Sequence, residues 1–394
     1  MKKITFAIVF SVLAMAVGAQ NIFTISGTVL DSKTGHPLPY CNCYLKHSYT
    51  GASTSTQGHF SIKLKSQLLP DTIVIQSIGY ESAEFPLVRK NSELGTIILE
   101  PRDTELKDVT VKAKATTWNK TLKTVFDSCF YKAYPTPNVA TTYYKQICNY
   151  KVGKKNYNNE EIVEVALDVL FPQKHNRRRN RDWIIFSNCS SSDEHFFVTG
   201  LRKTKNGKID LHPENSYNIY GIFDCNDFSR MLNENIYFYK NGTFEKAVAK
   251  ADLTLAKIDT IDGNTVYTLN GIIRKHNSIT ELTISFDSKH NTIYSYELVE
   301  STDTKNGQEV YKVKFNYRII DGYAVPLYFY YIITEEDIVN DTTFTISDEA
   351  LFSDTRPATD SINLSGKEAS GKNSFDFQGI KYDEDFWNNY TIIE

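Results

Sequence analysis

The first quarter of the chain alternates between short apolar runs and clusters of turn-forming residues. Gly35 and Gly58 fall in the turn clusters, where a residue without a Cβ adopts positive φ at no cost. Several short strands with turns at this spacing predict a small all-β sandwich. The segments with the length and alternation of strands are Ile22–Leu30, Pro39–Leu45, Gly51–Ile62, Thr72–Glu81 and Leu94–Leu99.

Residues 116–134 change to a helical period. Thr116 or Thr117 is a suitable N-cap, and Pro135 and Pro137 stop the pattern, so an amphipathic helix is expected. Its apolar stripe either docks on the sheet of its own domain, which is the commoner arrangement, or forms a partner-binding face. The stripe consists of Trp118, Leu122, Val125, Phe126, Cys129, Phe130 and Ala133.

Beyond residue 138 the pattern is again that of strands. The hairpin signals Asn241-Gly242, Asp262-Gly263, Asn306-Gly307 and Asp321-Gly322 predict tight turns in which glycine supplies a positive φ. The expected strands are Thr141–Tyr150, Glu161–Phe171, Trp183–Phe186, Ile236–Tyr239, Thr265–Leu269, Ser278–Phe286, Thr292–Glu300, Glu309–Tyr317, Tyr323–Ile333 and Thr342–Ile346. Strands joined in sequence by short turns form an antiparallel meander, so one large curved sheet is predicted.

The predicted fold is therefore mainly β, in an α+β arrangement of a sandwich, one helix and a larger sheet. Such a curved sheet backed by a helix is able to enclose an apolar cavity. The 25 Tyr and 23 Phe residues of the chain either line that cavity or fill it, and filling is the commoner outcome.

The first nineteen residues have the pattern of a cleavable signal peptide. Lys2 and Lys3 precede the apolar run 4–17, and the small residues 17–19 provide a cleavage site before Gln20. The apolar run is too short for a membrane-spanning helix, and no later segment is apolar enough to form one. Loss of the two lysines changes the formal net charge from -3 to -5, which disfavours nucleic-acid binding. We expect export to the periplasm, with the protein free or peripherally attached to the outer membrane.

All six cysteines follow the expected cleavage point, in a compartment that permits disulfides. Cys41 and Cys43 share one face of a strand and are poorly placed to bridge each other. Disulfide pairing and burial as small hydrophobes are equally good interpretations of each cysteine. No CxxC or paired-His spacing exists for a zinc site. The cysteines are Cys41, Cys43, Cys129, Cys148, Cys189 and Cys225.

Charged clusters are the remaining candidates for chemistry. The basic run 174–181 suits phosphate groups or an acidic partner, but a solvated hairpin tip is the more common origin of such a run. The acidic clusters Glu160-Glu161, Glu335-Glu336-Asp337 and 383–385 would serve a glycosidase only if two carboxylates faced one cleft. Nucleophile elbows, P-loops and dinucleotide fingerprints are absent from the sequence. We therefore expect a protein that is not an enzyme and has no catalytic, cofactor-binding or metal-binding residues.

Five pieces of the N-terminal region carry a family resemblance. They are Ser26-Gly27-Thr28-Val29, Asp31 with residues 34–38, Gly58-His59-Phe60, Ser77-Ile78-Gly79-Tyr80 and residues 105–111. Together they resemble the carboxypeptidase-regulatory-like domain, and this resemblance implies a transthyretin-like sandwich of exported Bacteroidetes proteins, without a zinc site. Ser55 stands where the pattern often has Asp, which we interpret as a change in turn chemistry.

Residues 134–137, 143–145 and 163–169, after the predicted helix, resemble the segment that follows this module in a group of exported Bacteroidetes proteins. The strand pattern 278–296 is similar to that of the half-barrel of lipoprotein-carrier proteins. The residue patterns and these resemblances together predict a signal peptide (1–19), a sandwich (20–113) and a helix with a β-rich domain (114–394). The expected role is interaction with an envelope protein, or binding of a lipid or glycan; an envelope hydrolase acting on carbohydrate or peptide is the alternative.

Overall fold

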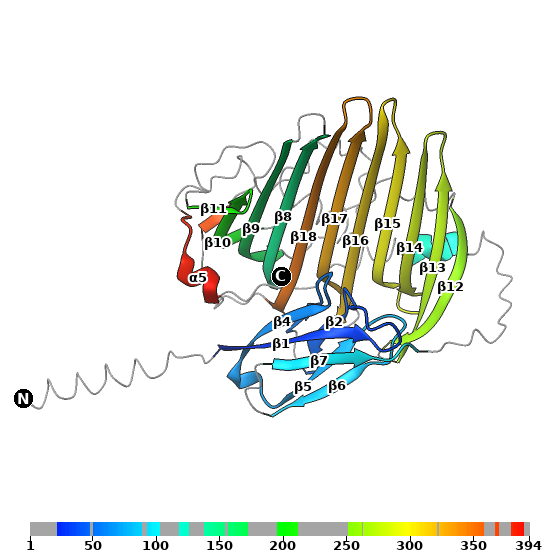
Figure 1. Cartoon of the computed structure of the whole chain (residues 1–394). Helices are drawn as coiled ribbons and strands as arrows, with labels where there is room; N and C mark the ends of the chain where they lie inside the picture. Colours follow the sequence, from blue (N-terminus) through cyan, green and yellow to red (C-terminus); the bar gives the residue numbers. More distant parts are fainter. Residues whose placement is uncertain are drawn as a thin grey trace, which may run out of the picture.

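The computed structural model places a small β-sandwich against one end of a large antiparallel sheet (Figure 1). Within the residues it describes the protein is mainly β, as the sequence pattern predicts. Those residues are 22–47, 50–88, 93–102, 118–125, 138–153, 157–171, 195–211, 251–261, 263–320, 323–357, 367–369 and 380–389.

The N-terminal sandwich, called the module below, consists of two sheets that share one core. Ile25 and Ile62 from the first sheet pack with Ile73 and Ile75 from the second, and all four are fully buried. The first sheet has the order β4 (His59–Lys65), β1 (Ile22–Asp31), β7 (Glu93–Leu99); the second has the order β3 (Gly51–Ser53), β2 (Asn42–Leu45), β5 (Asp71–Gln76), β6 (Ala83–Leu87), and a 3-10 turn, η1 (Ser66–Leu68), lies between β4 and β5.

The large sheet has twelve strands, eleven of them in one continuous order. That order is β11 (Lys208–Asp210), β10 (His195–Lys205), β9 (Tyr157–Phe171), β8 (Asn138–Val152), β18 (Thr342–Pro357), β17 (Tyr323–Asp337), β16 (Gly307–Ile320), β15 (Thr292–Asp303), β14 (Ser278–Asp287), β13 (Asn264–Arg274), β12 (Asp252–Ile261), and β19 (Lys367–Ala369) pairs with β10.

The predicted meander is correct in each half of this sheet but incomplete as a topology. In one half, β12 to β18 lie side by side in sequence order from the edge to the centre. In the other half, β8 to β11 lie side by side in sequence order from the centre to the opposite edge. The two halves meet where β18 pairs antiparallel with β8, over a register that begins at Thr342 and Val152. Adjacent hairpin signals predict only local pairing, so this long-range contact was not expected from the sequence.

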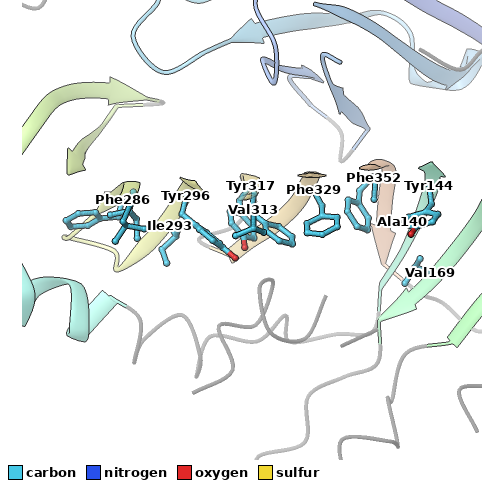
Figure 2. Close-up of a cluster of buried hydrophobic side chains, with 14 of the residues drawn as sticks. Ala140, Tyr144, Val169, Phe286, Ile293, Tyr296, Val313, Tyr317, Phe329 and Phe352 are labelled. Carbon is cyan, nitrogen blue, oxygen red and sulfur yellow. The ribbon is translucent and has the colours of Figure 1, made fainter. Parts of the chain in front are cut away.

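Alternation along each strand gives the large sheet an apolar face. Tyr296, Phe315 and Phe329 on neighbouring strands are buried there, and Phe315 packs against the other two rings at centroid distances of 5.6 and 4.6 Å. Figure 2 shows this band of side chains crossing the sheet on the side away from the module. Among these residues the rings fill the interior rather than line a space.

The helical residues 118–125 cover one end of the apolar face. Leu122 and Val125 are fully buried in the same core, and the Trp118 ring lies 5.6 Å from that of Tyr267. The preferred interpretation of the helix, docking on its own sheet, is confirmed over these residues; its predicted continuation to residue 134 lies outside the described residues. None of the described helices is long and apolar enough to cross a bilayer.

A second helix, α5 (Glu384–Asn389), packs at the opposite end of the sheet. Asp383 caps it by accepting a hydrogen bond of 2.9 Å from the Phe386 N–H, and Trp387 Nε1 donates to the Leu201 carbonyl at 3.3 Å. The guanidinium of Arg202 lies 4.8 Å from the centre of the Trp387 ring. The acidic cluster 383–385 therefore begins a helix.

Two sequence-based expectations about backbone conformation need correction. Gly263 has the expected positive φ of 76°, but Gly307 is not among the residues with positive φ. Gly307 is needed because a Cβ there would collide with the carbonyl oxygen of Glu336. The strand expected from Pro39 begins only at Asn42, since Tyr40 adopts a φ of 64°.

Three of the six cysteines lie in described residues, and each is free and buried. Burial raises the pKa of the Cys41 thiol to about 11 and that of Cys148 to about 12, so both are unreactive thiols at neutral pH. For these two and Cys43 the small-hydrophobe interpretation holds. The other cysteines, the basic run 174–181 and the predicted strands Trp183–Phe186 and Ile236–Tyr239 lie outside the described residues.

Candidate functional site

The module docks on the polar face of the large sheet, opposite the apolar face. Its strand β3 packs against β17 and β18. The ring of Tyr40 lies 4.4 Å from the ring of Tyr328, which is fully buried, and the Lys314 ammonium lies 4.0 Å from the centre of the Tyr40 ring. Tyr40 thus anchors the module on the sheet through an aromatic contact and a cation–π contact.

Polar side chains of β16 hold the backbone of the module. Asn316 Nδ2 donates to the Tyr40 carbonyl at 2.8 Å, and Arg318 Nη2 donates to the Leu45 carbonyl at 3.0 Å. The Arg318 guanidinium also lies 4.2 Å from the centre of the Tyr44 ring. These contacts satisfy carbonyl groups that flank β2 and fix the orientation of that strand.

A buried carboxylate joins the module to the edge strand β12. The Asp259 side chain is 1% exposed and accepts hydrogen bonds from Arg102 Nη1 at 2.6 Å and from the Gly79 N–H at 2.8 Å, with Lys257 Nζ at 3.5 Å. Arg102 also donates to the Thr260 carbonyl at 2.9 Å. Because Asp259 faces two cations and a backbone donor, this ion-pair group holds the module firmly at one edge.

The family motif shapes the loop that reaches Asp259. Asp31 accepts hydrogen bonds from the Thr34 N–H at 2.8 Å and from the Tyr80 hydroxyl at 2.6 Å. The Tyr80 bond and the backbone donors lower the pKa of Asp31. Tyr80 follows Gly79 directly, so the motif positions the N–H group that binds Asp259. Ser55 also has a turn role, since its side chain accepts from the Gln57 N–H at 3.2 Å.

Between these contacts lies a hollow of about 220 Å³, called the junction pocket below. Its floor on the sheet is a row of short side chains, Thr268, Ser285, Ser295 and Asn316, on four neighbouring strands. Such short side chains do not fill the space under the module. The pocket is lined by Pro39, Tyr40, Asn42, Gln76, Ser77, Ile78, Ile261, Thr268, Thr283, Ser285, Tyr294, Ser295, Tyr296, Glu297, Lys314 and Asn316.

In the part of the module that the structure describes, two polar atoms are buried at this junction without a hydrogen-bond partner: Asn42 Oδ1 and Ser53 Oγ. Asn42 and Ser53 are direct cross-strand partners. Their chain neighbours Cys43 and Ala52 point into the sandwich core, so Asn42 and Ser53 point out toward the large sheet. A buried polar group without a protein partner marks a place for water or a ligand.

The charged groups at the junction pocket are engaged with one another, with one carboxylate between two ammonium groups. Glu297 forms ion pairs with Lys312 Nζ at 2.7 Å and with Lys314 Nζ at 3.4 Å. Burial opposes ionisation of Glu297, but the two ammonium groups outweigh it and lower the pKa of the carboxyl. Burial lowers the pKa of Lys314, and Glu297 offsets only part of this effect. The pocket therefore presents amide and hydroxyl groups beside charged groups that are already paired with one another.

A larger hollow of about 900 Å³ opens at the far end of the sheet, by the hairpins. Glu309 and Glu335 face each other across β16 and β17 on its wall. At its base Glu161 is 2% exposed and pairs with Lys203 at 3.2 Å and Lys205 at 2.7 Å. The Glu161 carboxylate is therefore buried and engaged by two lysines. We place the candidate site at the junction, where both parts of the molecule contribute.

Sequence patterns did not indicate the junction residues. Asn42, Gln76 and Asn316 carry no motif, and Arg102 and Asp259 are 157 residues apart. The only local signal is β16, in which Lys312, Lys314 and Asn316 alternate with buried apolar residues and so mark a polar face. Glu335 and Glu336 are exposed at the end of β17.

Comparison with known families identifies the class of the module. A two-sheet sandwich is the structure that the five-piece resemblance implies. Asp31 and Tyr80, from two of the five pieces, are joined by a hydrogen bond in it. The model of the CarboxypepD_reg-like domain matches residues 25–111. The module is therefore a domain of this class. Among curated proteins none matches the chain.

Several solved structures show a distant likeness. A DUF1329 family protein from Desulfovibrio piger is 11% identical, with 64% of this chain and 95% of that chain covered and a TM-score of 0.22. An outer membrane lipoprotein-sorting protein domain from Vibrio parahaemolyticus is 12% identical, with 61% and 93% covered and a TM-score of 0.22. Lipovitellin is 8% identical, with 58% and 26% covered and a TM-score of 0.25. Likenesses at such TM-scores carry no argument about this chain.

Proposed function

We propose that the protein is an exported, non-enzymatic binding protein of the bacterial envelope that holds a small ligand between its module and its large sheet. The observation that carries this proposal is the junction pocket with the unpaired, buried Asn42 Oδ1 at its wall. Binding sites occur preferentially at domain interfaces, where a few polar groups converge in a preformed hollow.

The chemistry of the lining supports binding over hydrolysis. A glycosidase needs two carboxyl groups on either side of the substrate. The described lining has a single carboxylate, Glu297, and both of its oxygens are engaged by lysines. Neither Cys41 nor Cys148 has a thiol pKa suited to a nucleophile. These features favour recognition by hydrogen bonds without covalent chemistry.

An envelope location is proposed from the N-terminal sequence. Lys2 and Lys3 followed by the apolar run 4–17 and small residues is the pattern of a secretory signal. In that compartment the CarboxypepD_reg-like module would also serve as the contact to an envelope protein. A lipid carried on the apolar face is less favoured, because the described aromatic rings of that face already pack on one another.

Ligand-observed NMR with a library of small polar molecules tests the proposal. Ser295→Leu fills the pocket floor, whereas Ser301→Leu makes the same change on the same face of β15, six residues further along and about 20 Å away. Saturation-transfer signals are expected with the wild-type protein and with Ser301→Leu, and are expected to disappear with Ser295→Leu. Signals that survive Ser295→Leu, or no signals with any library member, would contradict the proposal.

A further inference from the structure

We infer that the ligand of the junction pocket is a small, neutral polyol, such as a cyclitol or a monosaccharide, bound through its hydroxyl groups alone. This inference rests on the proposed function. It follows from four properties of the pocket: its charge balance, its floor, its unpaired acceptor and its aromatic rings.

The charge balance of the lining selects a neutral ligand. Glu297 and Lys314 are the charged residues of the described lining, and they pair with each other, while Glu297 also pairs with Lys312. The ammonium of Lys314 is engaged further by the Tyr40 ring, at 4.0 Å. A cationic ligand would find no free carboxylate in this lining, and an anionic ligand would have to compete with Glu297 for the two ammonium groups. Either kind of ion would lose its hydration on entry, which is costly.

The floor of the pocket is suited to hydroxyl groups. Thr268, Ser285 and Ser295 present three short side chains with hydroxyls from adjacent strands, and the first two are 2.9 Å apart. A hydroxyl both donates and accepts, so this row matches a ligand whose own groups do the same. At about 30 Å³ for each water molecule, the hollow of about 220 Å³ holds roughly seven waters, which suits a compact molecule with one ring.

The unpaired Asn42 Oδ1 requires a hydrogen-bond donor on the part of the ligand that lies beside it. This atom is an acceptor only, so it requires an O–H or N–H donor from the ligand. A polyol supplies such a donor without carrying a charge. An ether or an apolar ring would leave Asn42 unsatisfied and would bind more weakly for that reason.

The aromatic rings of the lining are already engaged, which argues against a flat ligand. Tyr40 contacts Tyr328 and Lys314. Tyr296 contributes no ring to the pocket, because its side chain lies on the apolar face, where it stacks on Phe315 at 5.6 Å. Tyr294 is buried, and its hydroxyl accepts a hydrogen bond from Asn264 Nδ2 at 3.5 Å. Recognition therefore depends on hydrogen bonds and shape rather than on stacking, which distinguishes a polyol from a nucleobase or other aromatic ligand.

Isothermal titration with five probes tests the inference on the full mature chain. The neutral polyols are myo-inositol and D-glucose, the charged counterparts are D-glucuronate and D-glucosamine, and cyclohexanol is the ring with a single hydroxyl. We expect at least one neutral polyol to bind, and the charged probes and cyclohexanol to bind about tenfold more weakly or not at all.

Variants then assign the binding to this pocket. Asn42→Leu removes the acceptor and is expected to weaken polyol binding roughly 3- to 10-fold, the effect of one neutral hydrogen bond. Ser301→Leu should leave the affinity unchanged, and thermal unfolding of each variant shows that it is folded. Unchanged affinity in a folded Asn42→Leu protein would overturn the assignment.

The possible failures are distinguishable. If a charged or aromatic library member binds at the pocket while both polyols do not, the polyol inference is wrong and the proposed function stands. If no probe and no library member binds, both fall together. Loss of library binding in Ser295→Leu, with retention in Ser301→Leu, identifies the first case.

Discussion

The two faces of the large sheet differ completely although their residues alternate along the same strands. Nine register partners on one face are apolar: Leu201, Val165, Tyr144, Ala350, Phe329, Phe315, Tyr296, Ile284 and Leu269. Their chain neighbours on the other face are almost all charged or polar: Arg202, Glu164, Lys145, Glu349, Tyr330, Lys314, Glu297, Thr283 and Asn270.

This difference explains where stability and where binding reside. The apolar face buries large side chains against one another, so it contributes to stability through area removed from water. The polar face receives the module through individual hydrogen bonds and ion pairs, such as those of Asn316, Arg318 and Asp259. Such individual contacts do not require the two surfaces to be packed everywhere between them, and the junction pocket is the unfilled space between the module and the sheet.

The largest effect is expected from Phe329→Ala, in the middle of the apolar face. Phe329 is fully buried and packs on Phe315 at 4.6 Å, so its truncation should lower the free energy of unfolding by about 3 to 5 kcal/mol. Urea denaturation measures this value. The adjacent residue provides the control: Tyr330→Ala, on the half-buried polar face, should cost less than half as much. Equal losses would mean that the two faces contribute alike to stability.

The sequence predicted the parts of this fold that depend on local alternation. β14 starts at Ser278 as expected, and β15 at Thr292, because apolar residues recur at every second position over much of each strand, at Leu282, Ile284 and Phe286 in β14 and at Tyr294, Tyr296 and Leu298 in β15. β12 was missed, since its register shifts between Leu255 and Lys257 and breaks the alternation. The helical stripe was recognised by its period, and Leu122 confirms the face that it buries.

The site was not predictable in the same way, because it depends on partners far apart in the chain. Asn42 looks like an ordinary strand residue, and its importance arises only from the large sheet opposite it. No local pattern around Asp259 predicts a buried carboxylate, yet its side chain is 1% exposed and pairs with Arg102. Local pattern carries no information about such long-range contacts.

The next effect concerns the ion-pair group at the edge of the junction. Asp259→Ala leaves Arg102, Lys257 and the Gly79 N–H without their acceptor and should cost about 2 kcal/mol, since hydrogen bonds to a charged group are lost. Hydrogen exchange of the Gly79 amide should accelerate, while amides of β17 stay protected. Glu81→Ala removes the exposed partner of Arg102 and should cost less than about 1 kcal/mol. The reverse order would argue against Asp259 as the main contact.

The smallest effect is expected at Glu349, a half-buried carboxyl of the polar face. Glu349 lies opposite Lys145 on β8 and beside Tyr330 on β17, near Tyr328 and Tyr40. Burial raises the pKa of Glu349 above its ordinary value of 4.5, and Tyr328 and Lys145 counteract only part of this rise. The folded protein therefore binds this proton more tightly than the unfolded chain does.

The sign of the pH dependence follows from that difference. The stabilising contribution of protonated Glu349 is complete below pH 4.5 and is lost as the pH rises through the raised pKa. Glu349→Gln keeps the shape without the ionisation, so the variant should be more stable than the wild type at pH 8 and equally stable near pH 4. Urea unfolding at the two pH values measures the gap, and Glu281→Gln, at an exposed position on β14 opposite Ile272 and Val299, is the control. If Glu349→Gln is still more stable than the wild type at pH 4, the gain in stability comes from packing and not from the removal of a buried charge. Packing would then contribute to stability on the polar face as it does on the apolar face.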